Sequence, residues 1–428
     1  MRTQVFLVLW TAAPLLAQPQ SRTLTLKETV QLAQKQNPDL VLARLDEQKA
    51  MLQVRAVAEP LIPRTVAGSG LAWTTGFPLS IEGSAPSIVR LQGSRNLYNA
   101  PQSYLFAQTR ENARGATLGT AATRDEVALR AALLHLDLEQ VVRSLDPARK
   151  QVENLIQVAA TVQQRVEAGR ELPIESKRAA LNLSRARQRL VLLEGNRGRL
   201  SRALAIAIGL DPAEPVSPAM EERPEPRMPV DESASITEAV NNDKTIKRLE
   251  SDLVAKGLER KAHESAWKPT IQLVAQYALF SRFNNFDDYY RTFQRHNGQL
   301  GASIQIPVFA DQASKARAAQ AEVDARRIRL EINNTRNRIQ NEVRAEWQRI
   351  REAEAAREVA KADLDVAREQ ISVLLAQHEA GRTGLRELEE ARFVENERWI
   401  AFYEAWYALQ RARLELLKRL DLFAVAIP

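Results

Sequence analysis

The stretch QHEAGRTGLRELEEA, at residues 377–391, is the most informative part of the sequence because its central turn occurs twice in the chain. The segment QRVEAGRELPIESKRA, at residues 164–179, carries the same Glu-Ala-Gly-Arg sequence, and its Gly169 lies 212 residues before Gly381. Each copy interrupts a long run of helix-forming residues. A glycine directly after such a run is typical of a helix C-cap, so each copy is expected to end one helix before the next begins.

The helices beside these turns are predicted to be very long. Residues 308–380 contain neither Pro nor Gly, and at about 1.5 Å per residue such a helix is on the order of 100 Å long. A helix of this length must pack along a partner. The segment after Gly381 supplies one, because it repeats apolar residues at the spacing of a coiled coil: Phe402, Trp406, Leu409, Leu416 and Leu420. The turns, at about 167–173 and 379–385, are therefore predicted to be the tips of long antiparallel hairpins.

The whole plan is duplicated. Each half runs in the order helix, strand, strand, helix, turn, helix, over residues 18–210 and 234–428, and a connector rich in Pro and Glu joins them at 211–233. Pro147 lies inside the first long helix, where a kink is expected. Matching points keep an offset of 206 to 212 residues: Glu28 with Glu238, Pro63 with Pro269, Tyr98 with Phe309, and Gly169 with Gly381.

Each half also contains a pair of predicted strands. The first pair is expected at about 65–77 and 87–98, and the second at about 270–282 and 299–309. Apolar residues alternate with polar ones such as Gln272, and each strand is near the length that crosses a bilayer when tilted. A soluble four-stranded sheet that caps the helices is the alternative interpretation.

If these strands span a membrane, neighbouring subunits must complete the sheet. Four strands cannot close a barrel, and open strand edges are not tolerated in lipid. Three chains would supply twelve strands and, from two hairpins each, a tube with twelve helices in cross-section.

The N-terminus indicates export. Residues 1–17 combine a basic Arg2, an apolar run and a small Ala17, as a secretory signal peptide does; a buried N-terminal helix is the alternative. No later apolar run is long enough for a transmembrane helix. The net charge of +7 first suggests a nucleic-acid partner, but the signal and the interspersed acidic residues favour solvated helix faces instead.

The remaining composition argues against site chemistry. The chain has no cysteine, and its four histidines are scattered without metal-ligand spacing. No nucleophile, base and orienting group form a recognisable motif. We therefore expect no metal, no cofactor and no enzymatic activity.

The duplicated plan resembles the TolC-type outer-membrane efflux protein family. The resemblance covers essentially the whole mature chain and rests on LTLKETVQLAQKQNPDL at residues 24–40, the Pro before a strand, the strand-to-helix junction IPVFADQ at 306–312, and both tip turns. The chain departs from the family by lacking the lipidated Cys of some members, by Pro147 and by short outer loops.

The resemblance implies a mainly α fold with a small membrane β-barrel. Three chains would form an α-helical tunnel continuous with a shared 12-stranded β-barrel in the outer membrane of a Gram-negative-type bacterium, with a large periplasmic portion. The implied role is an exit duct for inner-membrane pumps, in efflux or secretion, reached through a periplasmic adaptor protein. Outer-membrane lipid is then a further partner.

The resemblance also implies where the duct narrows. The second hairpin would line the constriction with acidic side chains just after the turn, and those positions fall on Glu387 and Glu390. Their spacing of three places them on one helix face, and three copies would form carboxylate rings that favour cations. The matching positions of the first hairpin are Glu175 and Arg178, a charge-balanced pair. A solvated acidic helix face is the alternative interpretation.

Five residues are expected at the hairpin tips and in contact with the adaptor: Gly169, Arg170, His378, Gly381 and Arg382. The two arginines directly follow the glycines, where a guanidinium can bond carbonyls or carboxylates of a neighbouring tip or can meet the adaptor.

Two other classes of protein are alternatives to a channel. A periplasmic adaptor, or another helical-hairpin binding protein, also combines a hairpin with strands, but an adaptor would insert one hairpin between two halves of a β-rich module. This chain has two hairpins. A cytoplasmic coiled-coil scaffold conflicts with the signal peptide and the strand pairs.

Overall fold

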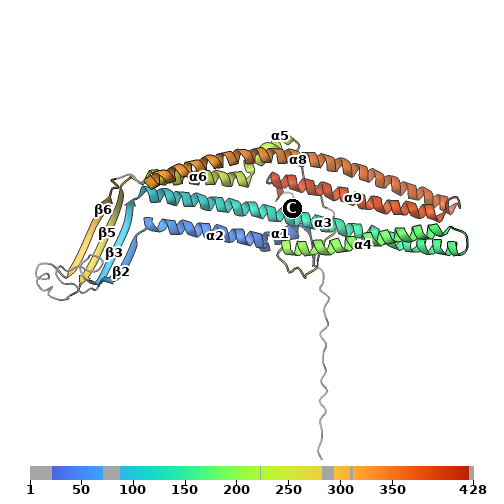
Figure 1. The fold of residues 1–428 in the computed structure, drawn as a ribbon, viewed down its shortest axis with the longest axis horizontal. Coiled ribbons are helices and arrows are strands. Elements are labelled where there is room, and N and C mark those ends of the chain that lie inside the picture. The colour runs from blue at the N-terminus through green and yellow to red at the C-terminus, as the bar shows by residue number, and fades with distance from the viewer. Residues whose placement is uncertain (1–21, 71–86, 222, 282–293, 309–311, 424–428) are drawn as a thin grey trace, which may run out of the picture. The chain divides into compact units, whose positions relative to one another are not determined.

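The computed structural model describes residues 22–70, 87–221, 223–281, 294–308 and 312–423 (Figure 1). The expected signal peptide lies outside these ranges, as do parts of three expected strands, at 71–77, 282 and 309.

The chain is mainly helical, and its plan is duplicated. The first repeat contains α1 (Leu26–Gln36), α2 (Pro38–Ala58), η1 (Glu59–Leu61), β2 (Arg64–Gly70), β3 (Ser87–Tyr98), α3 (Ala100–Glu167) and α4 (Pro173–Ala207). The second contains α5 (Glu232–Asn242), α6 (Lys244–Glu264), β5 (Thr270–Phe280), β6 (His296–Gln305), α8 (Gln312–Glu379) and α9 (Leu385–Arg419). Corresponding helices have the same lengths, 11, 21, 68 and 35 residues. The helix assignment of α3 runs through Pro147 without a break.

Both repeats start their second helix with the same kind of cap. Asn37 precedes α2, and its side-chain oxygen accepts a hydrogen bond from a backbone N–H of that helix at 2.9 Å. Asp243 lies 206 residues later and caps α6 in the same way, also at 2.9 Å. These caps stabilise the helix starts because the first N–H groups of a helix have no intrahelical acceptor. Thr25 and Glu28 form a capping box at α1.

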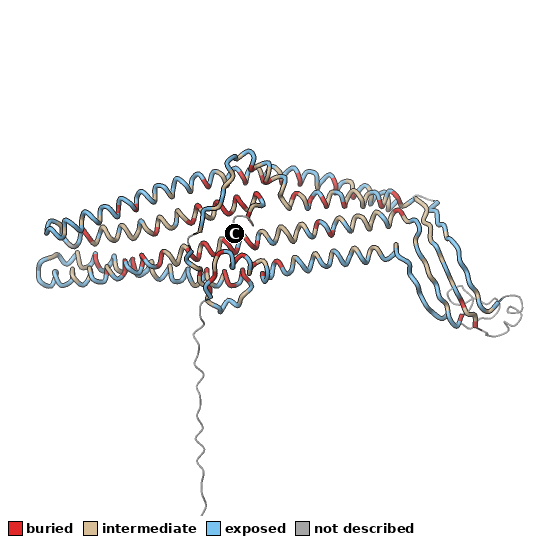
Figure 2. The backbone as a smooth tube through the Cα atoms, turned by 180° about the vertical axis from the view of Figure 1, so that it is seen from behind, coloured by how far each residue is buried: buried red, intermediate tan, exposed pale blue. Residues whose placement is uncertain are grey.

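One compact unit consists of the described parts of Met1–Leu40, Arg124–Glu232 and Val343–Pro428. Its buried residues form two main clusters (Figure 2). One joins α1, α3 and α4 to the short parallel pair β1 (Arg22–Leu24) and β4 (Val216–Pro218). The other joins α1 and α3 to α9. Gly209 ends the α4 turn at φ 76°, and a Cβ there would lie 2.5 Å from the carbonyl oxygen of Gln36, so only glycine fits.

A buried carboxylate lies at the centre of this unit. Glu139 on α3 has no exposed surface and accepts hydrogen bonds from Arg143, one turn along α3, at 3.3 Å, and from Arg223 in the connector. Arg143 also donates to the hydroxyl of Tyr407 on α9 at 2.9 Å. Burial raises the pKa of Tyr407, as does the neighbouring Glu139. The carboxylate thus joins three parts of the chain that are distant in sequence.

The connector is bonded to the second hairpin as well. Glu225, two residues after Arg223, bonds Arg357 on α8 at 2.9 Å and Arg413 on α9 at 2.7 Å. Arg413 is buried and also bonds Glu354 at 3.1 Å. The segment that sequence composition marks as a linker is therefore anchored by ion pairs to both hairpins.

The second unit consists of the described parts of Val41–Thr123 and Ser233–Glu342. It contains one antiparallel sheet with the strand order β2-β3-β5-β6, so the strands of the two repeats meet at β3 and β5. Polar contacts link its helices in the order α2, α3, α6 and α8, through Thr117 with Glu47, Ser251 with Glu111, and Lys256 with Asp324. The helices at the two ends of this order continue into the two edge strands of the sheet, because α2 is followed by β2 and β6 is followed by α8.

The first prediction concerns Glu139. The Glu139→Gln variant keeps the side-chain shape but leaves Arg143 and Arg223 without their shared counter-charge, so we expect the free energy of unfolding to fall by about 3 kcal/mol in urea titrations. Glu194→Gln is the matched control, because Glu194 and Arg149 form an ion pair in which both side chains are about half exposed. There the loss should stay below about 1 kcal/mol. Equal losses would contradict the role of Glu139.

The second prediction concerns His135, which is fully buried on α3. The Thr29 hydroxyl donates to the Thr25 carbonyl, so it accepts from the His135 Nδ1–H at 3.0 Å. The Nε2 atom has no hydrogen-bond partner in the described chain. Burial, with a smaller contribution from the Arg223 charge, lowers the pKa of His135 from 6.5 to about 4.

Between these two pH values the unfolded chain binds a proton that the folded chain does not, so stability rises with pH across this window. Acidification from pH 6.5 to pH 4 should therefore lower the free energy of unfolding by about 3 kcal/mol through this group. His135→Asn keeps a donor toward Thr29 and removes the titration. Urea unfolding of this variant should depend less on pH in that window; an unchanged pH dependence would assign the effect to other groups.

Candidate functional site: the sheet faces and the hairpin tips

The sheet has one apolar and one polar face. Side chains that are paired across strands point to the same face, so the register assigns each residue. On one face Leu91 pairs with Tyr277, and Ala275 pairs with Leu300. The apolar face is also the more exposed: Leu300 is 78% exposed and Ile304 is 61% exposed, whereas Gln272 and Gln276 on the opposite face are only partly exposed. A water-soluble sheet would bury its apolar face.

Aromatic residues lie toward both ends of the apolar face. Tyr98 pairs with Ile271 next to the helices. Tyr277 lies six residues further along β5, about 20 Å at 3.3 Å per residue, and its hydroxyl contacts His296 Nδ1 at 2.7 Å. Amphipathic rings of this kind mark the two interfaces of a membrane-crossing sheet.

The two edge strands each have one partner. Among the described strands, β2 pairs with β3 alone, and β6 pairs with β5 alone. The backbone groups on the outer edges of β2 and β6 therefore remain available to further strands.

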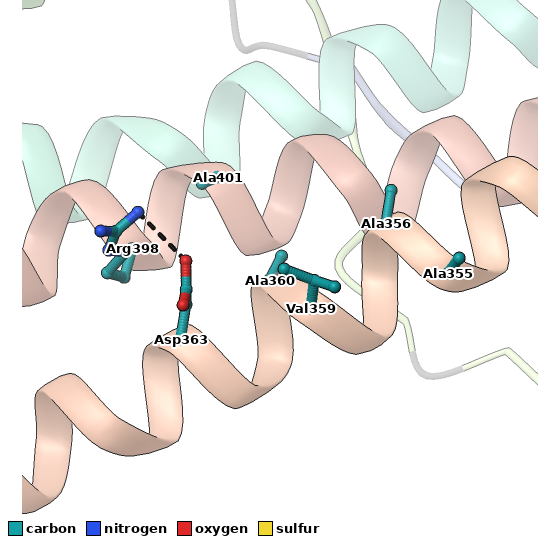
Figure 3. A pocket seen from close by; sticks show the side chains of 7 residues that line it. All are labelled: Ala355, Ala356, Val359, Ala360, Asp363, Arg398 and Ala401. Atoms are coloured by element: carbon teal, nitrogen blue, oxygen red, sulfur yellow. Dashed lines mark ion pairs between the residues drawn. The ribbon is translucent and has the colours of Figure 1, made fainter.

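Edge helices of both units expose apolar side chains at regular spacing. In the second unit α2 exposes Leu42, Leu45 and Leu52. In the first unit α8 exposes Val359, Val366 and Val373, each seven residues apart. Small side chains of α8 and α9 line a groove of about 380 Å³. Figure 3 shows these side chains and, beside them, the ion pair between Asp363 and Arg398, whose charged atoms lie 3.2 Å apart. The heptad spacing is that of a coiled-coil seam without its partner.

The two hairpin tips, both in the first unit, have the same backbone. Gly169 and Gly381 adopt φ values of 69° and 68°. Arg170 N–H donates to the Arg165 carbonyl at 2.8 Å, and Arg382 N–H donates to the Gln377 carbonyl at 2.8 Å. These six-residue closures are Schellman motifs, which require a left-handed residue and therefore favour glycine. The arginines that follow the glycines are exposed.

The side chains that close the tips differ between the repeats. In the first tip Arg165 pairs with Glu171 at 3.4 Å. The residues 212 positions later are Gln377 and Thr383, which form a neutral hydrogen bond of 3.0 Å. His378 Nδ1 also lies 2.9 Å from the Thr383 carbonyl oxygen, so the second tip is closed without charge.

The two sequence-predicted glutamates lie on the first turns of α9. Both are exposed, and the Glu390 side chain is 68% exposed. Glu390 lies 3.5 Å from Arg386, whereas Glu387 makes no ion pair with the described part of the chain. The buried residue between them is Leu388, which anchors this turn to the hairpin.

The sequence reasoning missed Arg386. Its guanidinium lies 3.8 Å from Glu175 on α4 and 3.5 Å from Glu390, so it links the second hairpin to the first. Beside it, α3, α4 and α9 line a pocket of about 410 Å³, and Phe393 packs on the apolar cluster of Val152 and Leu155. The sequence shows that Arg386 and Glu175 have opposite charges, but it does not show that they lie close together.

Several solved structures have a fold similar to that of this chain. No protein-family model matches the sequence, and no curated protein matches it. The Campylobacter jejuni CmeC outer membrane channel is 14% identical, with a TM-score of 0.77 over 99% of this chain and 94% of that chain. A membrane protein from Pseudomonas aeruginosa is 18% identical, with a TM-score of 0.76 over 92% of this chain and 90% of that chain.

A third structure, the open state of the Neisseria gonorrhoeae MtrE outer membrane channel, is 16% identical, with a TM-score of 0.68 over 94% of this chain and 88% of that chain. The chain has the TolC-type channel fold. The predicted fold class, mainly α with a small sheet in a duplicated plan, is confirmed. Within the described residues of this TolC-type fold, every helix is too short or too polar to cross a membrane.

The third prediction tests the link between the hairpins. Arg386→Gln removes the contact with Glu175, which contributes about 1 kcal/mol or less because Arg386 is exposed and Glu175 is still accessible to solvent. Spin labels on Arg170→Cys and Arg382→Cys, in a chain without other cysteines, should then report a broader distance distribution between the tips. Arg398→Gln is the control, since its partner Asp363 belongs to the same hairpin. The same broadening in both variants would contradict a specific role for Arg386.

Proposed function

We propose that this chain is one subunit of a trimeric outer-membrane channel that serves as the exit duct for an inner-membrane transporter. The observation that carries the proposal is the orientation of the sheet: its apolar face exposes Leu273, Leu300 and Ile304, whereas Gln272 and Gln276 on the polar face of the central strand β5 are only partly exposed. This orientation suits lipid outside and water inside. The solved structures of similar fold that are named as outer membrane channels support the same role.

Closure of the sheet requires other copies of the chain. Lipid cannot satisfy the free backbone groups of β2 and β6, and pairing β6 of one copy with β2 of the next joins two different edges. Such head-to-tail contacts close into a ring when the rotation fits. Three copies give a barrel of twelve strands, and the exposed apolar seams of α2 and α8 would pack between neighbouring subunits in the same rotation.

The hairpin tips would then meet the periplasmic adaptor that leads to the inner-membrane pump. The first tip offers an apolar contact, since Leu172 is 68% exposed and Ile174 is 48% exposed. The matching positions of the second tip are Gly384 and Arg386. Together with Gly169, Arg170, His378, Gly381 and Arg382, these residues make up the surface that we assign to the adaptor.

We assign the constriction to Glu387 and Glu390. Both carboxylates are exposed, and Glu387 has no counter-charge in the described chain, so three copies would place a negative ring at the second tips. The first hairpin is less suited to this role, because Glu175 already contacts Arg178 at 2.7 Å and Arg386 at 3.8 Å.

The fourth prediction tests the membrane face with two adjacent substitutions. Leu300→Lys puts a charge on the exposed apolar face and should cost about 2–4 kcal/mol near the bilayer midplane, so the protein should be lost from the outer-membrane fraction that resists alkaline extraction. Gln299→Lys introduces the same side chain on the polar face, and this variant should still insert and run at three protomer masses in detergent. Insertion of both variants would contradict the assignment of faces.

The fifth prediction tests the constriction. In planar bilayers, Glu387→Gln combined with Glu390→Gln should lower the preference for cations and weaken block by divalent ions, because Gln keeps the size and helix propensity without the charge. Glu175→Gln should do less, since two arginines already offset its charge. Dominance of Glu175 would assign the constriction to the first hairpin, and no effect of either would make the two glutamates a solvated helix face.

A further inference from the structure

The polar face of the sheet carries mainly neutral amide and hydroxyl side chains, whereas the second hairpin tip carries the acidic residues Glu387 and Glu390. Its central row joins Gln92, Gln276 and Gln299 across three adjacent strands. A second polar row on the same face joins Asn96, Gln272 and Ser303. It lies four residues along each strand from the central row. Amides and hydroxyls both donate and accept hydrogen bonds without net charge, so these rows form a neutral surface that can replace the water around a passing solute.

Within the described strands, the charged side chains on this face have one sign. The described residues of β2, β3, β5 and β6 include no Asp or Glu. The register places Arg64, which pairs with Ser94 and is exposed, on the polar face. Fixed positive charge on the wall of a narrow passage raises the local concentration of anions.

We propose that the polar face of the sheet lines the outer segment of the duct and makes that segment permissive for anions and for neutral hydrogen-bonding solutes. The inference rests on the proposed channel function and deepens it, because it assigns a preference for anions to the β-sheet segment of the duct. Any preference for cations then comes from the acidic pair at the second hairpin tip, and the β-segment opposes it. Organic anions are the solutes that this exit segment favours.

The same sheet supplies a matched control for Arg64. Arg95 is also exposed, lies on β3 and pairs with Leu273, which places it on the apolar face. It lies near the row of Tyr98, where a long side chain can reach lipid headgroups. Arg64→Gln and Arg95→Gln therefore remove the same charge from opposite faces of one sheet.

The first measurement is the reversal potential of the full-length trimer in a planar bilayer under a KCl gradient. Arg64→Gln should shift it toward the potassium limit, whereas Arg95→Gln should leave it unchanged. In the variant that carries both Glu387→Gln and Glu390→Gln, the remaining wall charges should make the channel prefer chloride, and adding Arg64→Gln should reduce that preference. A shift from Arg95→Gln equal to that from Arg64→Gln, or no shift from either, overturns the inference.

The second measurement uses the absence of cysteine from the chain. Single cysteines at Gln272, Gln276 and Gln299 should react with a membrane-impermeant, negatively charged methanethiosulfonate during recording and shift selectivity toward cations. Cysteines at Leu273, Ala275 and Leu300, the adjacent residues on the apolar face, should not respond. Reaction only at the second set overturns the inference even if an arginine variant misfolds.

These results separate the inference from the function on which it rests. A wild-type protein that forms no conducting pore contradicts the proposed channel. A conducting wild type whose selectivity is unaffected by charge on the polar face refutes the inference about the lining and leaves the channel in place.

Discussion

A helix of 68 residues can bury its side chains only by packing along other helices, and every other feature of this chain follows from that constraint. Both α3 and α8 have this length, so each needs a return helix, and each return helix needs a turn that leaves the chain antiparallel. The glycines of the two tips meet that need with the same left-handed residue. Packing along the sides also leaves outer seams, such as Val359, Val366 and Val373 on α8, exposed in the part of the chain that the structure describes.

Side-to-side packing is reinforced where it would otherwise slip. Alanine and leucine seams are similar from turn to turn, so apolar contact alone specifies the register of long helices weakly. Glu139 adds a fixed point, because its buried carboxylate is satisfied only when Arg143, Arg223 and the α9 helix are all in place. The ion pair between Arg386 and Glu175, which solvent still reaches, is weaker by comparison. The hairpins are thus held firmly at Glu139 and loosely at their tips.

Duplication preserved the backbone and allowed the side chains to diverge. Equal helix lengths and matching caps, such as Asn37 and Asp243, keep the two repeats superimposable in plan. The tips nevertheless differ: a charged pair closes the first and a neutral pair closes the second. A chain with two similar hairpins can in this way carry different side chains at its two tips without altering the backbone geometry that both need.

The helices, turns and strands could be predicted from the sequence, because helix propensity, glycine turns and strand alternation are local properties. It predicted both hairpins and the duplicated plan, and it identified the alternation that separates Gln272 from Leu273. The kink expected at Pro147 stays a prediction, because the helix assignment of α3 runs through this residue, with buried Leu145 and Ala148 on either side, and a kinked helix can keep an unbroken assignment. Three features depend on tertiary contacts: the apolar face of the sheet is the more exposed one, Arg223 in the connector bonds Glu139, and Arg386 contacts Glu175. These contacts join residues far apart in the chain, and one sequence read alone contains no measure of which distant side chains meet.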